Sequence, residues 1–351
     1  MGDTERTNVV VVGAGASQEF KLPTGAGLAK AIAEFCRLDT GEFGEFQSGN
    51  QKFFGIIKSL SGSANPVGRL DAWIKAANQI AVNMPLAPSI DNFLHTHQDN
   101  ALLVEVGKIA ISACILEAEK QSTLNVQTDN IYNKLEFVKA EETWIARYFS
   151  LLVTHRGFEE FLTALKKITF VSFNYDRCIE QFFLNAARSY FNLTDADSIR
   201  INTALRVIHP YGSLGDIKWD GHQTRGFGAQ ANANNIESYV DRIKTFTEGA
   251  KSDEIGPLIR SALENCDLLI FLGFSFHPLN MRLLEAKQPF NVPRVLATGK
   301  GLSKESQELI RLELHRKFSD GMADVSKTVS IVDGSCADLF YEHHRYLSVD
   351  K

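Results

Sequence analysis

A run of four valines directly before a glycine-rich turn constrains the fold of this chain more than any other feature. Residues 8–17 read Asn-Val-Val-Val-Val-Gly-Ala-Gly-Ala-Ser. Four consecutive valines cannot alternate between a buried and an exposed face, so they predict a strand buried on both faces, as in a parallel sheet. A helical pattern begins soon after the glycines, and a glycine turn followed by a helix amino terminus suits a phosphate group. The stretch therefore predicts a nucleotide site.

The same turn departs from the usual dinucleotide-binding fingerprint. Gln18 stands where a third glycine is expected, and no acidic residue closes a second strand about 20 residues later. A tight strand–helix turn without a ligand is therefore the alternative interpretation of this stretch taken alone.

Size and composition favour an ordinary globular protein. The chain has 351 residues, of which 44% are hydrophobic and 23% charged, and its net charge of −5 gives no general reason to expect nucleic-acid binding. No apolar run has membrane-spanning length and the first residues lack a signal-peptide pattern, so we expect a soluble, cytoplasmic protein without a membrane partner.

The cysteines and histidines do not suggest a metal site. The five cysteines are far apart in the sequence, which suits reduced thiols in a core. His95 and His97 form a close pair, but no cysteine or acidic cluster accompanies them. We therefore expect no bound metal.

Hydrophobic periodicity divides the chain into a sheet-forming part and a helical part. We expect residues 1–38 and 166–351 to form one core, and residues 39–165 to form a mostly helical insertion between its first and second strands. Within the insertion, 39–67 is polar and glycine-rich, as in a loop with a short helix, and 70–165 has the three-four spacing of amphipathic helices.

The core part alternates short apolar runs with helical patterns. After the valine run, further strands are predicted near residues 167–173, 204–209, 267–272, 294–298 and 328–332. About six strands alternating with helices predict an α/β, Rossmann-like, doubly wound parallel sheet.

Polar residues stand where four of these strands end. They are Ser17, Asn174 with Asp176, His209, and Ser275. Because open parallel sheets bind ligands beyond the carboxyl ends of their strands, we expect these side chains to share a pocket. Four of them also have a structural alternative: a helix cap for Asn174, a first-turn acid for Asp176, a turn residue for His209 and a partner for loop backbone groups for Ser275.

The ordered combination of motifs resembles the sirtuin superfamily, and more closely the Sir2-like NAD-hydrolysing domains of bacterial anti-phage defence systems. The resemblance covers nearly the whole predicted sheet and leaves the helical insertion unmatched. The matching stretches are residues 13–17 with Pro23 and Thr24, 172–176, 209–213, 273–276 with Asn280, and 333–337.

The resemblance implies NAD as the substrate and assigns roles to individual residues. Asn174 would hold the ribose hydroxyls or position the attacking water, and His209 would be the general base at the ribose. Asp176 would recognise the nicotinamide carboxamide or order its loop. The other NAD-binding residues that the resemblance implies are Gly13, Ala14, Gly15, Ser17, Pro23, Thr24, Gly273, Phe274, Ser275, Asn280, Ser335 and Cys336.

Two departures from the lysine-deacylating sirtuins favour hydrolysis of NAD by water. The chain lacks their four-cysteine zinc module, and residues 22–27 read Leu-Pro-Thr-Gly-Ala-Gly instead of their Gly-Ile-Pro-Asp-Phe-Arg. The resemblance therefore implies an NAD glycohydrolase that depletes NAD in abortive anti-phage defence. The alternatives are a non-catalytic module that senses NAD or ADP-ribose, and a sirtuin-type protein deacylase or ADP-ribosyltransferase.

An unregulated NAD hydrolase would kill its host. We therefore expect control through a homo-oligomer or a separate defence partner, such as a HerA-type ATPase or an Argonaute-like protein.

Overall fold

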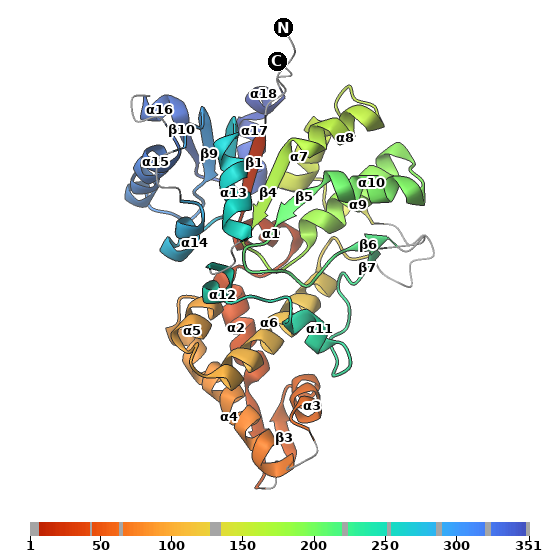
Figure 1. Cartoon of the computed structure of the whole chain (residues 1–351), viewed down its shortest axis with the longest axis vertical. Helices are drawn as coiled ribbons and strands as arrows, with labels where there is room; N and C mark the ends of the chain where they lie inside the picture. Colours follow the sequence, from red (N-terminus) through yellow and green to blue (C-terminus); the bar gives the residue numbers. More distant parts are fainter. Residues whose placement is uncertain are drawn as a thin grey trace.

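A computed structural model describes residues 7–348 except for 43, 63–65, 127–134, 220–223, 251–253, 286–289 and 320–323. Its centre is a six-stranded sheet in the order β10-β9-β8-β1-β4-β5, and all neighbouring strands are parallel (Figure 1). The predicted α/β, Rossmann-like fold class is confirmed. The strands are β1 (Asn8–Val12), β4 (Ile168–Ser172), β5 (Arg206–Ile208), β8 (Leu268–Leu272), β9 (Arg294–Thr298) and β10 (Val329–Val332).

The valine strand lies in the middle of this sheet, between β4 and β8. Val10 pairs with Phe170 on one side and with Ile270 on the other. Val9 and Val11 belong to the hydrophobic core on one face of the sheet, and Val10 and Val12 belong to the core on the other face. Burial on both faces explains why the strand needs valine at four successive positions.

Helices cover both faces of the sheet. The core that contains Val10 and Val12 includes residues of α7, α8, α9, α10 and α17, whereas α13 and α15 contribute to the core on the opposite face. These helices are α7 (Trp144–Val153), α8 (Phe158–Lys166), α9 (Cys178–Phe191), α10 (Asp195–Ala204), α13 (Ile255–Glu264), α15 (Lys304–Phe318) and α17 (Cys336–Glu342).

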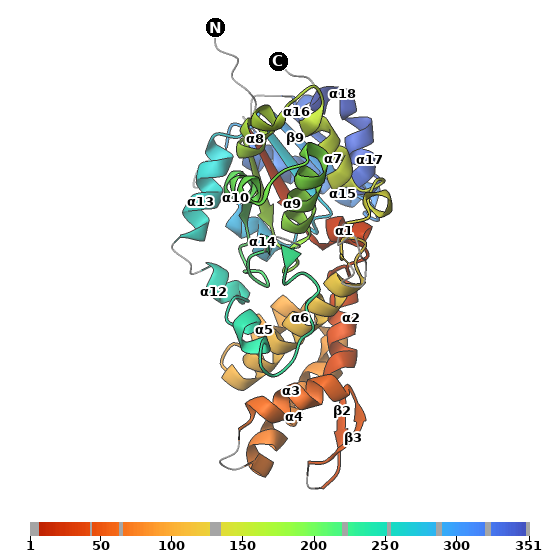
Figure 2. The ribbon, with the colours of Figure 1, turned by 90° about the vertical axis from the view of Figure 1, so that its right-hand side faces the viewer.

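A second group of helices stands beyond the carboxyl ends of the strands, in the lower half of Figures 1 and 2. We call this group the helical body. It consists of α2 (Gly25–Cys36), α3 (Gln51–Leu60), α4 (Pro66–Asn83), α5 (Ile90–Thr96) and α6 (Ala101–Gln121), with the hairpin β2 (Leu38–Thr40) and β3 (Phe46–Gly49).

The predicted helical segment 39–165 is therefore divided in space. Its earlier helices, α3 to α6, belong to the helical body, whereas α7 and α8 pack on the sheet. The β2–β3 hairpin lies where the sequence predicted a loop with a short helix. Its strands are short and β3 is mostly exposed. The hairpin therefore lacks the alternation of buried and exposed residues by which a strand is recognised in a sequence.

Shorter elements complete the chain. Among the described residues, no helix is long and apolar enough to cross a membrane. The remaining elements are α1 (Ala14–Ser17), η1 (Gln18–Phe20), η2 (Met84–Leu86), η3 (Phe137–Lys139), β6 (Lys218–Trp219), β7 (Thr224–Arg225), α11 (Ile236–Val240), α12 (Phe246–Ala250), α14 (Pro278–Leu283), α16 (Val325–Thr328) and α18 (His344–Leu347).

Candidate functional site

A cavity of about 820 Å³ lies between the carboxyl ends of the strands and the helical body. Its volume is in the range of small-molecule and cofactor sites. The structure brings together here most of the residues that the sequence predicted. Those that line the cavity are Gly13, Ala14, Gly15, Thr24, Asn174, Gly273, Phe274, Ser275, Asn280, Ser335 and Cys336.

The glycines after β1 serve the packing of two loops against each other. The N–H of Gly13 donates to Leu272 O at 2.9 Å, and the N–H of Gly15 donates to Gly273 O at 3.0 Å. Gly273 has a φ of +54°, and a Cβ added there would lie 2.0 Å from the nitrogen of Ala16. The need for glycine thus follows from backbone-to-backbone contact, and these two N–H groups bond to the last residue of β8 and to the residue after it instead of a phosphate.

Helix α2 supplies a different surface for an anion. Thr24 caps the helix, with its Oγ1 accepting the N–H of Gly27 at 3.2 Å. Thr24, Gly25 and Ala26 all line the cavity, and a Cβ added at Gly25 would meet nothing within 4 Å. The amino terminus of a twelve-residue helix carries partial positive charge, and Lys300, which follows β9, also lines the cavity. The wall is therefore suited to a phosphorylated ligand.

Asn174 joins the β4 loop to the glycine turn. Its side chain is buried, and its Nδ2 donates to Gly13 O at 3.1 Å and to Ser17 Oγ at 2.9 Å. It does not cap α9, which begins at Cys178, so the structural alternative for Asn174 is wrong. Instead Asp176 accepts the N–H of Cys178 at 3.1 Å.

Ser17 and Asp176 support Asn174 without lining the cavity themselves. The Ser17 hydroxyl hydrogen-bonds to both side chains. Burial raises the pKa of Asp176, although the N–H of Cys178 and the Ser17 hydroxyl act in the opposite direction. Asp176 precedes Arg177, the N-cap of α9, and the acid in the first turn of that helix is Glu180, so the first-turn alternative for Asp176 is wrong.

His209 lies outside the residues that line the cavity. Its Nδ1 donates to the backbone oxygen of Asn174 at 3.0 Å, and its Nε2 lies 2.9 Å from Oε1 of Glu180. Burial disfavours the charged ring, but the Glu180 carboxylate and the two hydrogen bonds outweigh burial and raise the pKa of His209. With both nitrogens engaged, the ring holds the backbone of Asn174 and is not arranged to accept a proton from a ligand.

Pro23 lines a second cavity, of about 960 Å³, whose walls include α2, α3 and α6. Thr24, the next residue, lines the first cavity. Pro23 and Thr24, which were predicted together as ligand-binding residues, therefore line two different cavities.

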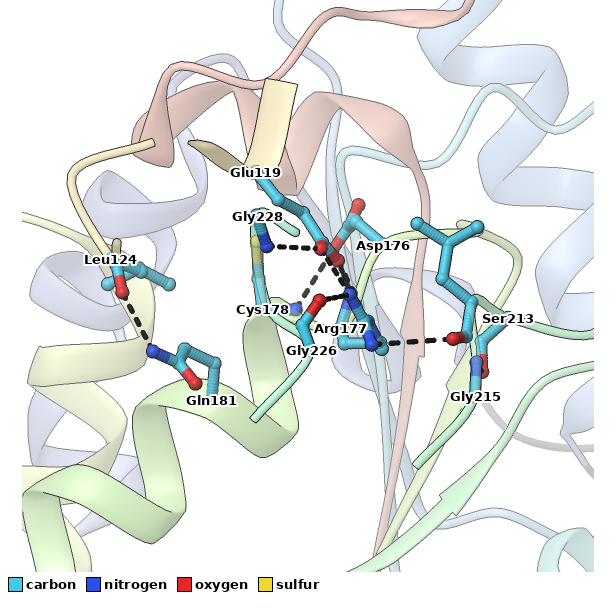
Figure 3. A network of polar contacts seen from close by, with 11 residues as sticks. Glu119, Leu124, Asp176, Arg177, Cys178, Gln181, Ser213, Gly215, Gly226 and Gly228 are labelled. Carbon is cyan, nitrogen blue, oxygen red and sulfur yellow. Dashed lines mark hydrogen bonds and ion pairs between the residues drawn. The ribbon is translucent and has the colours of Figure 1, made fainter. Parts of the chain in front are cut away.

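A buried ion pair ties the Asn174 loop to the helical body (Figure 3). Glu119 of α6 accepts the backbone N–H of Arg177 at 3.1 Å and its Nε at 3.0 Å through Oε1, and the N–H of Gly228 at 3.0 Å through Oε2. The guanidinium also donates to the backbone oxygens of Leu214 and Gly226. The pair could not be predicted from the sequence, because its members are 58 residues apart.

Helix α5 and the β8 loop add polar groups that the sequence analysis did not select. Asp91 and His277 line the cavity, and the Tyr175 hydroxyl donates to Oδ1 of Asp91. The Tyr211 hydroxyl donates to Oδ1 of Asn280, and Nδ1 of His277 accepts the N–H of Leu279.

The cysteines are free thiols, and burial raises the pKa of Cys336, the one that lines the cavity. Within the described ranges, no group of three or more histidine, cysteine, aspartate or glutamate side chains is arranged to hold a metal ion.

Comparison with protein-family models gave no match, and no curated protein matched the chain. The resemblance to Sir2-like domains thus rests on the motifs and their order in the sequence.

Proposed function

We propose that this protein is an NAD glycohydrolase, which converts NAD and water to nicotinamide and ADP-ribose. The observation that carries the proposal is the place of Asn174. Its buried amide lines the cavity and is fixed by the carbonyl of Gly13 and the hydroxyl of Ser17, at the point where the β1 turn meets the β4 loop.

The remaining walls support a dinucleotide as the ligand. The cavity follows the ends of β1, β4, β8, β9 and β10, where an open parallel sheet binds ligands. The amino terminus of α2 and the Lys300 ammonium suit a diphosphate.

Cleavage of the bond between nicotinamide and ribose passes through an oxocarbenium-like state. An enzyme accelerates such a reaction by holding the ribose and by stabilising positive charge at its anomeric carbon. Both N–H groups of Asn174 Nδ2 bond to Gly13 O and Ser17 Oγ, so its Oδ1 is the atom that accepts a hydrogen bond from a ribose hydroxyl or a water molecule. In the present geometry His209 acts as a positioning residue, because it contacts the Asn174 backbone rather than the cavity.

The second candidate function is a module that binds NAD or ADP-ribose without turnover. It is favoured by the engagement of both His209 nitrogens, which leaves the histidine predicted as the general base without a role in the cavity. The wider role as an NAD-depleting defence protein, controlled by self-association or by a partner, is part of the proposal and depends on the sequence motifs.

Incubation of the purified full chain with NAD distinguishes these functions. Equimolar nicotinamide and ADP-ribose, separated by chromatography, support the hydrolase. Binding of ADP-ribose in calorimetry with no release of nicotinamide supports the sensing module. Absence of both binding and turnover would reject the cavity as a dinucleotide site.

A further inference from the structure

The helical body contributes an acidic side chain to the cavity. Pro88, Ser89, Asp91 and Asn92 line the wall formed by the start of α5. Ser89 caps this helix, with its Oγ accepting the N–H of Asn92 at 3.2 Å, so the first turn is held in place. Figures 1 and 2 show α5 below the sheet, on the side where the carboxyl ends of the strands lie.

Asp91 is held in a fixed relation to the Asn174 loop. The hydroxyl of Tyr175 donates to Oδ1 of Asp91, and Tyr175 directly follows Asn174 in the chain. The Tyr175 side chain is buried, which limits the positions that its hydroxyl can take. One loop therefore carries the Asn174 amide and, through the next residue, contacts the Asp91 carboxyl of α5.

The other carboxyl group at the cavity wall already has a structural task. Glu19 accepts the N–H of Trp144 at 2.7 Å through Oε2 and the N–H of Ala337 at 2.9 Å through Oε1. Both of its oxygens thus tie the β1 turn to neighbouring helices. Asp91 uses Oδ1 for a side-chain hydroxyl, and it is the better candidate for chemistry on a ligand.

We infer that Asp91 is a catalytic carboxylate of the proposed NAD hydrolysis, on which this inference rests. Its negative charge stabilises the oxocarbenium-like ribose, as carboxylates do in glycoside hydrolysis. The oxygen of a water molecule bonds to the anomeric carbon as the bond from that carbon to the pyridinium nitrogen breaks. The electron pair of the broken bond leaves with nicotinamide and neutralises its ring, and the water proton passes to Asp91 and then to solvent.

The surroundings of Asp91 predict how the activity depends on pH. Burial raises the pKa of Asp91, while the Tyr175 hydroxyl and the nearby His277 lower it. Tyr211 faces the carboxyl as well, and on the adjoining α12 Glu248 is paired with Lys108 of α6. Because the ionised form is the active one, turnover is lost as the pH falls through the pKa of Asp91.

The first test is Asp91→Asn in the full chain, with Asp99→Asn as the matched control on the exposed segment after α5. Asparagine keeps the size and the acceptor for Tyr175 but removes the charge. We expect nicotinamide release to fall about 100-fold or more, with ADP-ribose binding within threefold of wild type. The control should match wild type in both measurements.

The second test is Tyr175→Phe, which removes the hydroxyl that lowers the pKa of Asp91. The acid limb of turnover against pH should therefore move to higher pH. An unshifted limb would overturn the inference, and this test decides it if Asp91→Asn does not fold.

The outcomes separate this inference from the proposed function. Wild-type turnover that survives in Asp91→Asn to within threefold would overturn the role of Asp91 and leave the hydrolase standing. A wild-type protein that binds ADP-ribose but releases no nicotinamide would overturn both.

Discussion

Arg177 and Glu119 form an ion pair that is almost entirely buried, with side-chain exposures of 1% and 0%. The pair connects the loop that carries Asn174 with α6 of the helical body, and the nitrogen Nε of Arg177 lies 3.0 Å from Oε1 of Glu119. The guanidinium also donates to the carbonyls of Leu214 and Gly226. Three parts of the chain that are distant in sequence therefore meet at one arginine.

Removal of one member of this pair should destabilise the protein strongly. Glu119→Gln leaves the Arg177 guanidinium buried without a counter-charge, and we expect a loss of about 3–5 kcal/mol in the free energy of unfolding. Urea denaturation followed by circular dichroism measures the change. Glu159→Gln, which breaks the exposed pair with Arg200, is the control and should have no detectable effect. An equal effect of the two variants would contradict the structural role of the buried pair.

Gly273→Ala should disrupt the contact between the β8 loop and the β1 turn. The substitution combines a φ of +54° with a Cβ 2.0 Å from the backbone of Ala16, so we expect destabilisation by at least about 2 kcal/mol. Gly55→Ala in the middle of α3 is the control, because its Cβ would meet nothing within 4 Å. That variant should gain about 0.5–1 kcal/mol, and thermal unfolding of both variants tests the contrast.

The Glu180–His209 pair should stabilise the fold at low pH more than at high pH. The folded-state pKa of His209 is raised above its value in the unfolded chain. The stabilisation from this pair is therefore complete below about pH 6.5 and is lost as the pH rises through the folded-state pKa. We expect Glu180→Gln to lower the melting temperature more at pH 6 than at pH 9. Glu237→Gln, at an exposed position on α11, should show no such dependence; if Glu180→Gln shows none either, the assigned ion pair is wrong.

Lys300→Ala should weaken the binding of ADP-ribose about tenfold. The lysine follows β9 and lines the cavity, and loss of one hydrogen bond to a charged phosphate costs about 1.5 kcal/mol. Calorimetric titration measures the affinity, with Lys304→Ala at the start of α15 as the control of equal charge. A Lys300→Ala variant that binds as tightly as wild type would place the diphosphate elsewhere.

The sheet could be predicted from the sequence because each strand carries its own signal. The valine run, the apolar stretch 268–272 and the other short runs all form strands, since burial on both faces of a parallel sheet requires continuous apolar residues. Because each predicted strand also fixes where its carboxyl end lies, the positions of Asn174 and of the glycine turns that line the cavity could be predicted as well.

The partners of these residues could not be predicted in the same way. Asp91 lies 84 residues before Tyr175, and Glu119 lies 58 residues before Arg177, so no local spacing relates them. His209 shows the converse limit. Its place after a strand predicted a position in the pocket, and the resemblance implied a general base, whereas Glu180 and the Asn174 carbonyl occupy both of its nitrogens.

The most direct measurement of the central claim is the rate of nicotinamide release from NAD by the wild-type chain, by Asn174→Ala and by Asn83→Ala. Asn83, at the end of α4, is the control because it bonds within its own helix and does not line the cavity. We predict release by wild type and Asn83→Ala at the same rate, and a loss of about 100-fold or more in Asn174→Ala. Release by a folded Asn174→Ala at the wild-type rate would contradict the assignment of this cavity as the site of NAD hydrolysis.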